Sequence, residues 1–307
     1  MSNIEATFVF VPIRPEFIKP ALESLYRFTQ INFRVVVVDQ TKNGIADLVK
    51  DYADLVLRPR RNLGFSKANN EGIIHGLQWG SKYVVACNDD VVFIDKRWWG
   101  GIIEQFERYP EMLAVNPASV VEPGWGYGVG VPGNSVPDWG VVVDGDIWPK
   151  KPDGTALTVE EAKTKEGYDF LLEHRKGHIE GFAGWCVVGK SKELWQDVGL
   201  YDERFWSGGG EDYDMVQRIY LAGGRASATC GSYVHHYWNK SKDIMGGKDT
   251  GKVDMLPGNR PSFSDTNSLF EHSLDGANSP IFPPRDNELF GNKRKRKSKE
   301  IFIDDIR

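Results

Sequence analysis

Two short segments of this 307-residue chain place carboxylates where they suit catalysis or ligand binding. The segment 208–214 reads Gly-Gly-Gly-Glu-Asp-Tyr-Asp, and apolar residues recur at helical spacing directly after it. Glu211 and Asp212 are therefore expected in the first turn of a helix that follows a flexible glycine run. Carboxylates in a first turn also complement the helix dipole, so a purely structural role is the alternative interpretation.

The second acidic segment, 88–90, reads Asn-Asp-Asp and follows an apolar run typical of a buried strand. Oxygen ligands at a strand end suit a hard divalent cation, which leaves coordination sites for substrate phosphates. An Asx turn that only reverses the chain is the structural alternative. A pair of histidines, His235 and His236, lies in a later strand-like segment, and imidazole is a ligand for transition metals.

The elements around these segments predict an α/β fold with a doubly wound sheet flanked by helices. Predicted strands alternate with predicted helices in the order 7–11, 21–28, 35–38, 45–52, 54–57, 67–80 and 83–87. Residues 12–20 are expected to form a loop. The run 35–38 consists of four valines, which indicates burial on both faces of a parallel sheet. Because ligands bind beyond the carboxyl ends of such strands, Pro12, Asp39 and the segment 88–90 are expected at one edge of the sheet.

Composition disfavours several classes of protein. A net charge of −5 argues against a chain that coats nucleic acid over its whole surface, although a local basic patch is compatible with it. Three cysteines without metal-like spacing predict reduced thiols in the core and a cytoplasmic location. The N-terminal residues do not read as a signal peptide, and apolar runs stay below the ~20 residues of a membrane helix, so we expect a soluble protein without a membrane span.

Two regions extend beyond the predicted sheet. Residues 122–154 are rich in Gly, Pro and Trp and predict a loop insertion, whose aromatic rings fit either a small additional core or an acceptor platform. Near the C-terminus the chain is polar and rich in turn residues, and 293–299 is a basic run typical of a solvated tail. The expected organisation is a catalytic domain over 1–242, an acceptor-side insertion at 122–178 within it, and a C-terminal extension over 243–307.

The order of these features resembles that of family 2 glycosyltransferases with the GT-A fold. The resemblance covers roughly residues 5–242, and its most specific parts are the Asn-Leu-Gly segment at 62–72 and the Glu-Asp pair at 211–212. Its other landmarks follow in the same order along the chain, at 12–15, 35–39, 88–90, 181–184, 198–205 and 235–236. One departure is that the usual Asp-x-Asp of the family is Asn-Asp-Asp here, which makes the first ligand position neutral.

The resemblance implies that a sugar moves from a nucleotide-sugar donor, most simply a UDP-sugar, to an acceptor hydroxyl by an inverting displacement. Such transfer needs positive charge on the diphosphate leaving group and a base for the hydroxyl proton. By resemblance Asp90 and His236 hold manganese or magnesium, His236 alternatively touching the diphosphate. Asp212 is then the general base, and Glu211 orients the acceptor or supports the loop. The donor contacts implied in the same way are Pro12, Arg14, Asp39, Asn62, Gly64, Lys67, Asn88 and Asp89.

The acceptor stays open at this point. A glycan or another hydroxyl compound is the first expectation. The alternative is a hydroxylated base of DNA, with the basic run 293–299 on phosphates. A further alternative is a non-catalytic protein that binds sugar or nucleic acid, because Asn88 is neutral. A nucleotidyltransferase is disfavoured, since residues 12–15 do not form a glycine-rich, basic phosphate loop.

Overall fold

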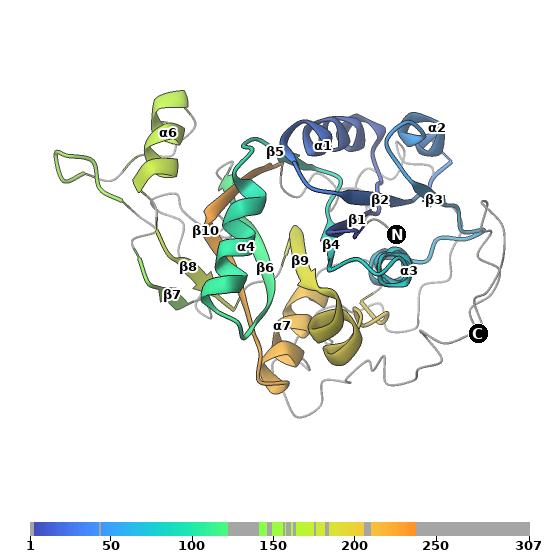
Figure 1. Cartoon of the computed structure of the whole chain (residues 1–307). Helices are drawn as coiled ribbons and strands as arrows, with labels where there is room; N and C mark the ends of the chain where they lie inside the picture. Colours follow the sequence, from blue (N-terminus) through green and yellow to red (C-terminus); the bar gives the residue numbers. More distant parts are fainter. Residues whose placement is uncertain are drawn as a thin grey trace.

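The N-terminal half of the chain alternates between strands and helices, as its apolar runs predict (Figure 1). The computed structural model describes residues 3–42, 44–121, 141–145, 149–155, 157, 161, 164–174, 176–181, 184–205 and 210–237. Four parallel strands form one side of the sheet: β1 (Ala6–Phe10), β2 (Phe33–Val38), β3 (Leu55–Leu57) and β4 (Tyr83–Cys87). Helices α1 (Pro15–Phe28), α2 (Ile45–Val49) and α3 (Phe65–Gln78) connect them.

The later strands make the sheet mixed. The remaining elements are β5 (Val91–Phe93), α4 (Trp98–Arg108), β6 (Met112–Val121), β7 (Val141–Val143), α6 (Lys165–His174), β8 (His178–Glu180), β9 (Cys186–Lys190), the π-helix η1 (Ser191–Val198), α7 (Glu211–Leu221) and β10 (Arg225–His236). The strand order is β3-β2-β1-β4-β9-β6-β10-β8-β7, and β5 pairs with β10. Strand β9 runs antiparallel to both of its neighbours, β4 and β6. The prediction of a doubly wound α/β sheet flanked by helices is therefore confirmed.

Each face of the sheet is covered by its own set of helices. Along β1, Phe8 and Phe10 point into a cluster formed with α1, α2 and α4, whereas Val9 points into a cluster formed with α3, η1 and α7. In Figure 1, α1 and α2 accordingly lie above the strands, and α3 lies below them. All five residues of β1 are buried, which explains why the central strands read as continuous apolar runs.

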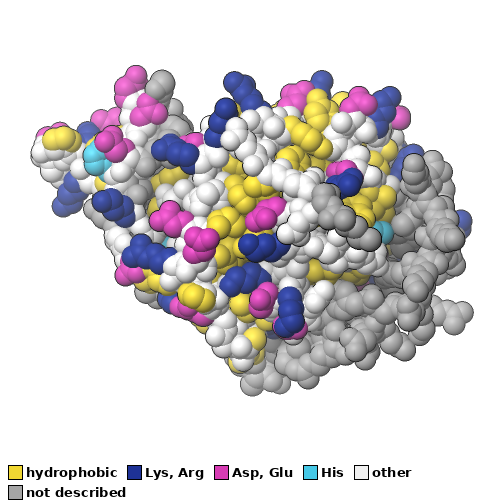
Figure 2. Space-filling view, in the orientation of Figure 1, with side chains coloured by type: hydrophobic (Ala, Val, Ile, Leu, Met, Phe, Trp, Pro, Cys, Tyr) yellow, Lys and Arg dark blue, Asp and Glu magenta, His cyan; other side chains and the backbone are white. Residues whose placement is uncertain are grey.

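Charged side chains of both signs are interspersed over the face that Figure 2 shows, with apolar side chains between them. No single basic patch dominates that face, which agrees with the moderate negative net charge of the chain. None of the described helices combines the length and the apolar character that a bilayer crossing requires.

Two expectations for the fold were wrong. Helix α1 begins at Pro15 and not after residue 20, because proline has the φ angle of a first helical turn and needs no amide partner there. The region 122–154 is not a loop throughout, since Val141–Val143 form β7 and pair with β8 at the edge of the sheet. The tryptophans of the insertion (125, 139 and 148), the extension 243–307 and its basic run 293–299 lie outside the described residues.

Glycine allows α3 to approach the sheet closely. A Cβ atom built on Gly72 would lie 2.2 Å from Cγ1 of Val9, well inside van der Waals contact. At Gly76 a Cβ atom would lie 2.9 Å from Cγ2 of Val84. Packing of α3 on β1 therefore explains why the segment 62–72 ends in a glycine, Gly72.

We expect Gly72→Ala to lower the free energy of unfolding by about 1–3 kcal/mol, because the added methyl group overlaps Val9. Gly100→Ala is the matched control, since a Cβ atom there meets nothing within 4 Å. The double variant Gly72→Ala/Val9→Ala should recover part of the loss. Denaturant unfolding of the four proteins is the measurement, and a Gly72→Ala variant as stable as the wild type would contradict this packing.

Candidate active site

The Asn-Asp-Asp segment forms a turn between β4 and β5. The amide of Val91 donates to the carbonyl of Asn88 at 3.4 Å, so the predicted chain reversal is present. Its first carboxylate faces the loop after β1: Oδ2 of Asp89 accepts hydrogen bonds from the amides of Ile13 at 2.8 Å and Arg14 at 3.3 Å. Asp89 thus ties the carboxyl ends of β1 and β4 together.

The second carboxylate lies against a distant histidine. The Nε2 atom of His236 is 3.0 Å from Oδ1 of Asp90, and both side chains are buried. Pairing of β5 with β10 brings them together, since His236 is the register partner of Val91. Asn88, 148 residues away in the sequence, places its Nδ2 atom 3.4 Å from the same Nε2 atom. The ring of Trp185 stacks on the imidazole at 5.4 Å between centroids, a contact that the sequence did not predict.

Two adjacent, buried carboxylates are electrostatically unfavourable when no positive charge lies beside them. Burial, and next the charge of Asp90, raise the pKa of Asp89 from 3.8 to about 7, although the amides of Ile13 and Arg14 oppose this shift. A divalent cation beside them would relieve the repulsion, and carboxylate oxygen with imidazole nitrogen is a donor set that manganese accepts. In the described part of the chain, no group of three or more ligating side chains is arranged to hold a metal ion. Asp90 and His236 would supply two ligands for a cation, and substrate oxygens and water would have to supply the others.

The three carboxylates at the start of α7 differ in their burial and in their partners. Helix α7 begins at Glu211, directly after Gly210 with its positive φ of 100°. Glu211 is buried, Asp212 is half-buried, and Oδ1 of Asp212 accepts a hydrogen bond from the amide of Tyr213 at 2.8 Å. Asp214 forms a fully buried ion pair with Arg218 at 2.8 Å, so it has a structural role.

Two cysteines lie next to the Asn-Asp-Asp segment. Cys87 and Cys186 are register partners on β4 and β9, and both are buried free thiols, as expected for core cysteines. Burial raises the pKa of Cys87, and the charges of Asp90 and Asp89 add to this. Near the second acidic segment, burial likewise raises the pKa of the Tyr201 hydroxyl, and the charges of Glu211 and Asp212 act in the same direction.

The predicted donor contacts after β2 are engaged with their own loops. Asp39 accepts hydrogen bonds from the amide and hydroxyl of Thr41, at 2.9 and 2.7 Å, and from the amide of Ala46 at 3.0 Å. Oδ1 of Asn62 accepts from the amide of Gly64 at 2.8 Å. Gln40, which the sequence analysis missed, binds this loop through the amide of Leu63 at 2.6 Å and the carbonyl of Gly64 at 3.2 Å. No sequence signal pointed to Gln40, because it binds backbone atoms that any residue type offers.

The other predicted donor contacts also lie near this edge of the sheet. Pro12 and Arg14 are in the loop after β1, which Asp89 holds. Lys67 is in the first turn of α3, and its Nζ atom is 3.1 Å from Oε2 of Glu203. The structure therefore brings Asn88, Asp90 and His236 into direct contact, while Asp39, Asn62 and Lys67 contact residues other than these.

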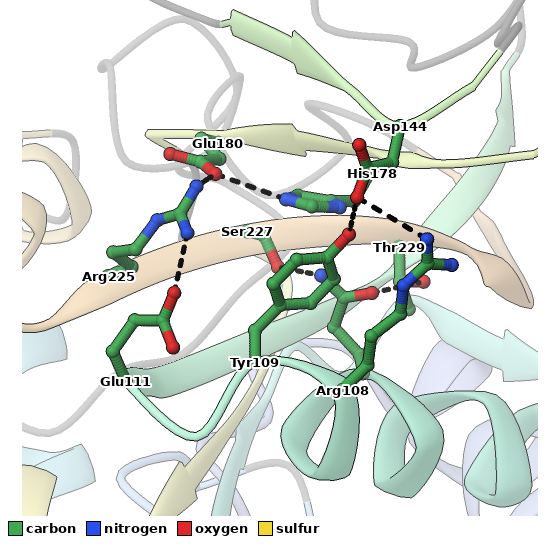
Figure 3. Close-up of polar contacts among 10 residues, drawn as sticks. Arg108, Tyr109, Glu111, Asp144, His178, Glu180, Arg225, Ser227 and Thr229 are labelled. Carbon is green, nitrogen blue, oxygen red and sulfur yellow. Dashed lines mark hydrogen bonds and ion pairs between the residues drawn. The ribbon is translucent and has the colours of Figure 1, made fainter.

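A second polar cluster lies at the opposite end of β10 (Figure 3). Arg225 pairs with Glu180 and also with Glu111, at 2.6 Å in the latter case. Glu180 in turn lies 3.2 Å from Nε2 of the buried His178. Asp144, next to β7, contacts the hydroxyl of Tyr109 and the guanidinium of Arg108 at the end of α4. The cluster fastens the paired strands β7 and β8 to α4 and β10 and is a structural feature.

Two family models match the regions just described. The model of Glycosyl transferase family 2 matches residues 9–129, and that of the N-terminal domain of galactosyltransferase matches residues 170–240. Residues 9–129 therefore resemble glycosyl transferase family 2, and the fold is that of GT-A glycosyltransferases. The first match contains the Asn-Asp-Asp segment and the loops with the predicted donor contacts. The second match contains α7 and His236.

One solved structure supports this fold. The crystal structure of GalNAc-T7 with UDP, GalNAc and Mn2+ has a TM-score of 0.52 and 14% identity, and the match covers 90% of this chain and 55% of GalNAc-T7. The crystal structure of S. aureus TarS 1-349 in complex with UDP-GlcNAc is also similar, with a TM-score of 0.47 and 14% identity, and the match covers 80% of this chain and 61% of TarS 1-349. The chain therefore spans less than two thirds of the length of either protein. No curated protein sequence matches it.

The buried His178 should make the stability of the protein depend on pH. Burial, followed by the charge of Arg225, lowers the pKa of His178 from 6.5 to about 4, and Arg108 acts in the same direction against Asp144 and Glu111. Because protons bind the unfolded chain more tightly, the stabilisation is complete above pH 6.5 and is lost as the pH falls toward 4. Between pH 7 and pH 5 the free energy of unfolding of the wild type should fall by about 2 kcal/mol more than that of His178→Gln.

Denaturant unfolding of both proteins at the two pH values is the measurement. Asp89 titrates in the same window with the opposite sign, since its raised pKa makes protonation favour the folded state. This contribution is common to both proteins and cancels in the difference. Parallel pH dependence of wild type and variant would contradict the environment assigned to His178.

Proposed function

We propose that this glycosyltransferase moves a sugar from a UDP-sugar to an acceptor hydroxyl by a single inverting displacement that a divalent cation assists. The observation that carries the proposal is the contact of Asp90 with His236 at 3.0 Å, beside a second buried carboxylate at the carboxyl ends of β1 and β4. Ligands of α/β sheets bind at this edge. The crystallisation of GalNAc-T7 with UDP, GalNAc and Mn2+ supports the choice of donor and cation.

On the donor side, Asp90 and His236 would hold manganese or magnesium, which supplies positive charge for the diphosphate leaving group. Asn88 places an amide beside the same imidazole, so a neutral residue at this position fits a supporting role. Asp89 holds the loop that carries Pro12 and Arg14. The oxygens of Asp39 already accept three hydrogen bonds, and contact with the donor ribose would use their remaining lone pairs.

On the acceptor side, Asp212 is our choice for the general base. It is more accessible than Glu211, and Asp214 is already paired with the buried Arg218. A base must reach the hydroxyl proton in the loaded enzyme, which favours a half-buried carboxylate at the mouth of the site. Glu211, its buried neighbour, would orient the acceptor or support the helix start.

A glycan or another hydroxyl compound is the acceptor that we propose. The DNA alternative relied on the basic run 293–299 and on tryptophans outside the described residues, and no contact among the described residues favours it. The buried free thiols of Cys87, Cys186 and Cys230 support a reducing, cytoplasmic location.

The cation site is tested by thermal unfolding with UDP-sugars. A ligand at about 100 times its Kd stabilises the native state by about 2.7 kcal/mol, so UDP-GlcNAc or UDP-GalNAc with manganese should raise the Tm of the wild type. Asp90→Asn should lose the manganese-dependent part of this shift. Asp95→Asn is the matched control, because Asp95 lies in the loop after β5 and pairs with the exposed Arg97. Turnover that is unchanged by a chelator would contradict the cation assignment.

The general base is tested by Asp212→Asn, which keeps the shape of the side chain and removes its basicity. Release of UDP with a panel of glycan acceptors should fall by roughly 10²–10⁴, while donor affinity stays near that of the wild type. Asp197→Asn, which removes an exposed carboxylate paired with Lys192, is the control for charge alone. Wild-type turnover in Asp212→Asn would move the base to another residue, with Glu211 next.

A further inference from the structure

Polar side chains in the first turns of helix α3 form hydrogen bonds with the chain segment 201–205. The side-chain amide of Asn70 makes two backbone hydrogen bonds with Tyr201: it donates to the carbonyl at 2.8 Å and accepts from the amide at 2.9 Å. The hydroxyl of Ser66 donates to the carbonyl of Phe205 at 2.8 Å. Asn70 and Ser66 are fully buried, and both act on backbone atoms. They therefore fix the path of the segment whatever side chains it carries.

The segment 201–205 contacts the start of α7 through Phe205. The ring of Phe205 lies against Gly210, where a Cβ atom would be 2.7 Å from Cε1 of the ring. Gly210 is the residue that precedes Glu211, so the position of Phe205 sets the start of the helix. Tyr201 is buried close enough to Glu211 and Asp212 for their charges to raise the pKa of its hydroxyl, behind the larger effect of burial.

The same end of α3 also holds the donor-side loop. Gly64 is the N-cap of α3, and its carbonyl accepts from the amide of Ala68 at 3.4 Å. Gln40, at the end of β2, binds both Leu63 and Gly64. One helix end thus contacts the loop on the donor side and the segment that leads to α7. Close packing of Gly72 on Val9 holds this helix rigidly on the sheet.

We propose that Asn70 is a positioning residue, which holds the segment 201–205 so that Asp212 keeps a fixed distance from the donor-side loop. The proposal rests on the function proposed above for Asp212. Asn70 itself is buried and would touch neither donor nor acceptor. It acts through the backbone of Tyr201, and its loss should misplace the base without removing a donor contact. A displacement of about 1 Å at a reacting group is enough to cost about 100-fold in rate.

The test compares Asn70→Ala with Ser81→Ala. The control removes a buried hydrogen bond of similar kind, between the hydroxyls of Ser81 and Thr7 at 2.6 Å, at the opposite end of β1. Both variants should lose comparable stability in denaturant unfolding. Asn70→Ala should lower kcat about 10- to 100-fold with little change in donor KM, whereas Ser81→Ala should keep the kcat of the wild type.

A double-variant cycle with Asp212→Asn separates positioning from folding. If Asn70 acts through Asp212, then Asn70→Ala should cause little further loss of kcat once the base is gone. Additive losses in the double variant, equal losses of kcat in Asn70→Ala and Ser81→Ala, or a change confined to donor KM would each overturn the proposal. Wild-type turnover in Asp212→Asn alone would instead show that the base was misassigned. If Asn70→Ala fails to fold, Ser66→Ala, which loses only the bond to Phe205, is judged by the same criteria.

Discussion

The antiparallel pairing of β5 with β10 is the contact on which the candidate active site depends. It sets Val91 opposite His236 and so brings Asp90 to the imidazole. A register shift by one residue would turn His236 to the other face of the sheet, because side chains alternate along a strand. The amide of Tyr237 also donates to the carbonyl of Asp90 at 3.1 Å, which fixes the register beyond the last strand residue.

The pairing assembles a site that is electrostatically costly. Asp89 and Asp90 are adjacent, buried carboxylates, and burial, followed by the charge of Asp90, raises the pKa of Asp89. The fold compensates in part with the amides of Ile13 and Arg14. A buried charge that is incompletely compensated is a feature of binding sites more than of structural turns, since ligand binding can supply the missing opposite charge. This imbalance favours the cation site over the simple turn, although the turn itself is present.

The start of α7 is organised differently, by packing and by neutral hydrogen bonds. Arg218 neutralises Asp214, so that carboxylate is part of the structure of α7. Asn70 and Ser66 hold the preceding segment by its backbone, and α3 is anchored in turn on β1 through Gly72. The two sides of the site therefore share one rigid support. The polar cluster around Arg225 lies at the other end of β10 and attaches the paired strands β7 and β8.

The sequence by itself determined the fold class and the local position of each motif. Four-valine and similar runs are buried on both faces, and such runs followed by helical periodicity specify a doubly wound sheet with its polar residues at strand ends. Local signals also predicted that Glu211 and Asp212 begin a helix, as they do. They failed for Pro15, which begins α1, and for the valines of β7, because a proline after a strand and a valine run among glycines are both compatible with a loop.

Only the tertiary structure decided which of these residues meet. The contact of Asp90 with His236 and the stacking of Trp185 depend on strand pairing between segments far apart in the chain. The roles of Gln40 and Asn70 depend on backbone groups that become neighbours only after α3 packs on the sheet. A side chain that binds another segment's backbone leaves no pattern in the sequence, because its partner offers the same amide and carbonyl whatever its residue type.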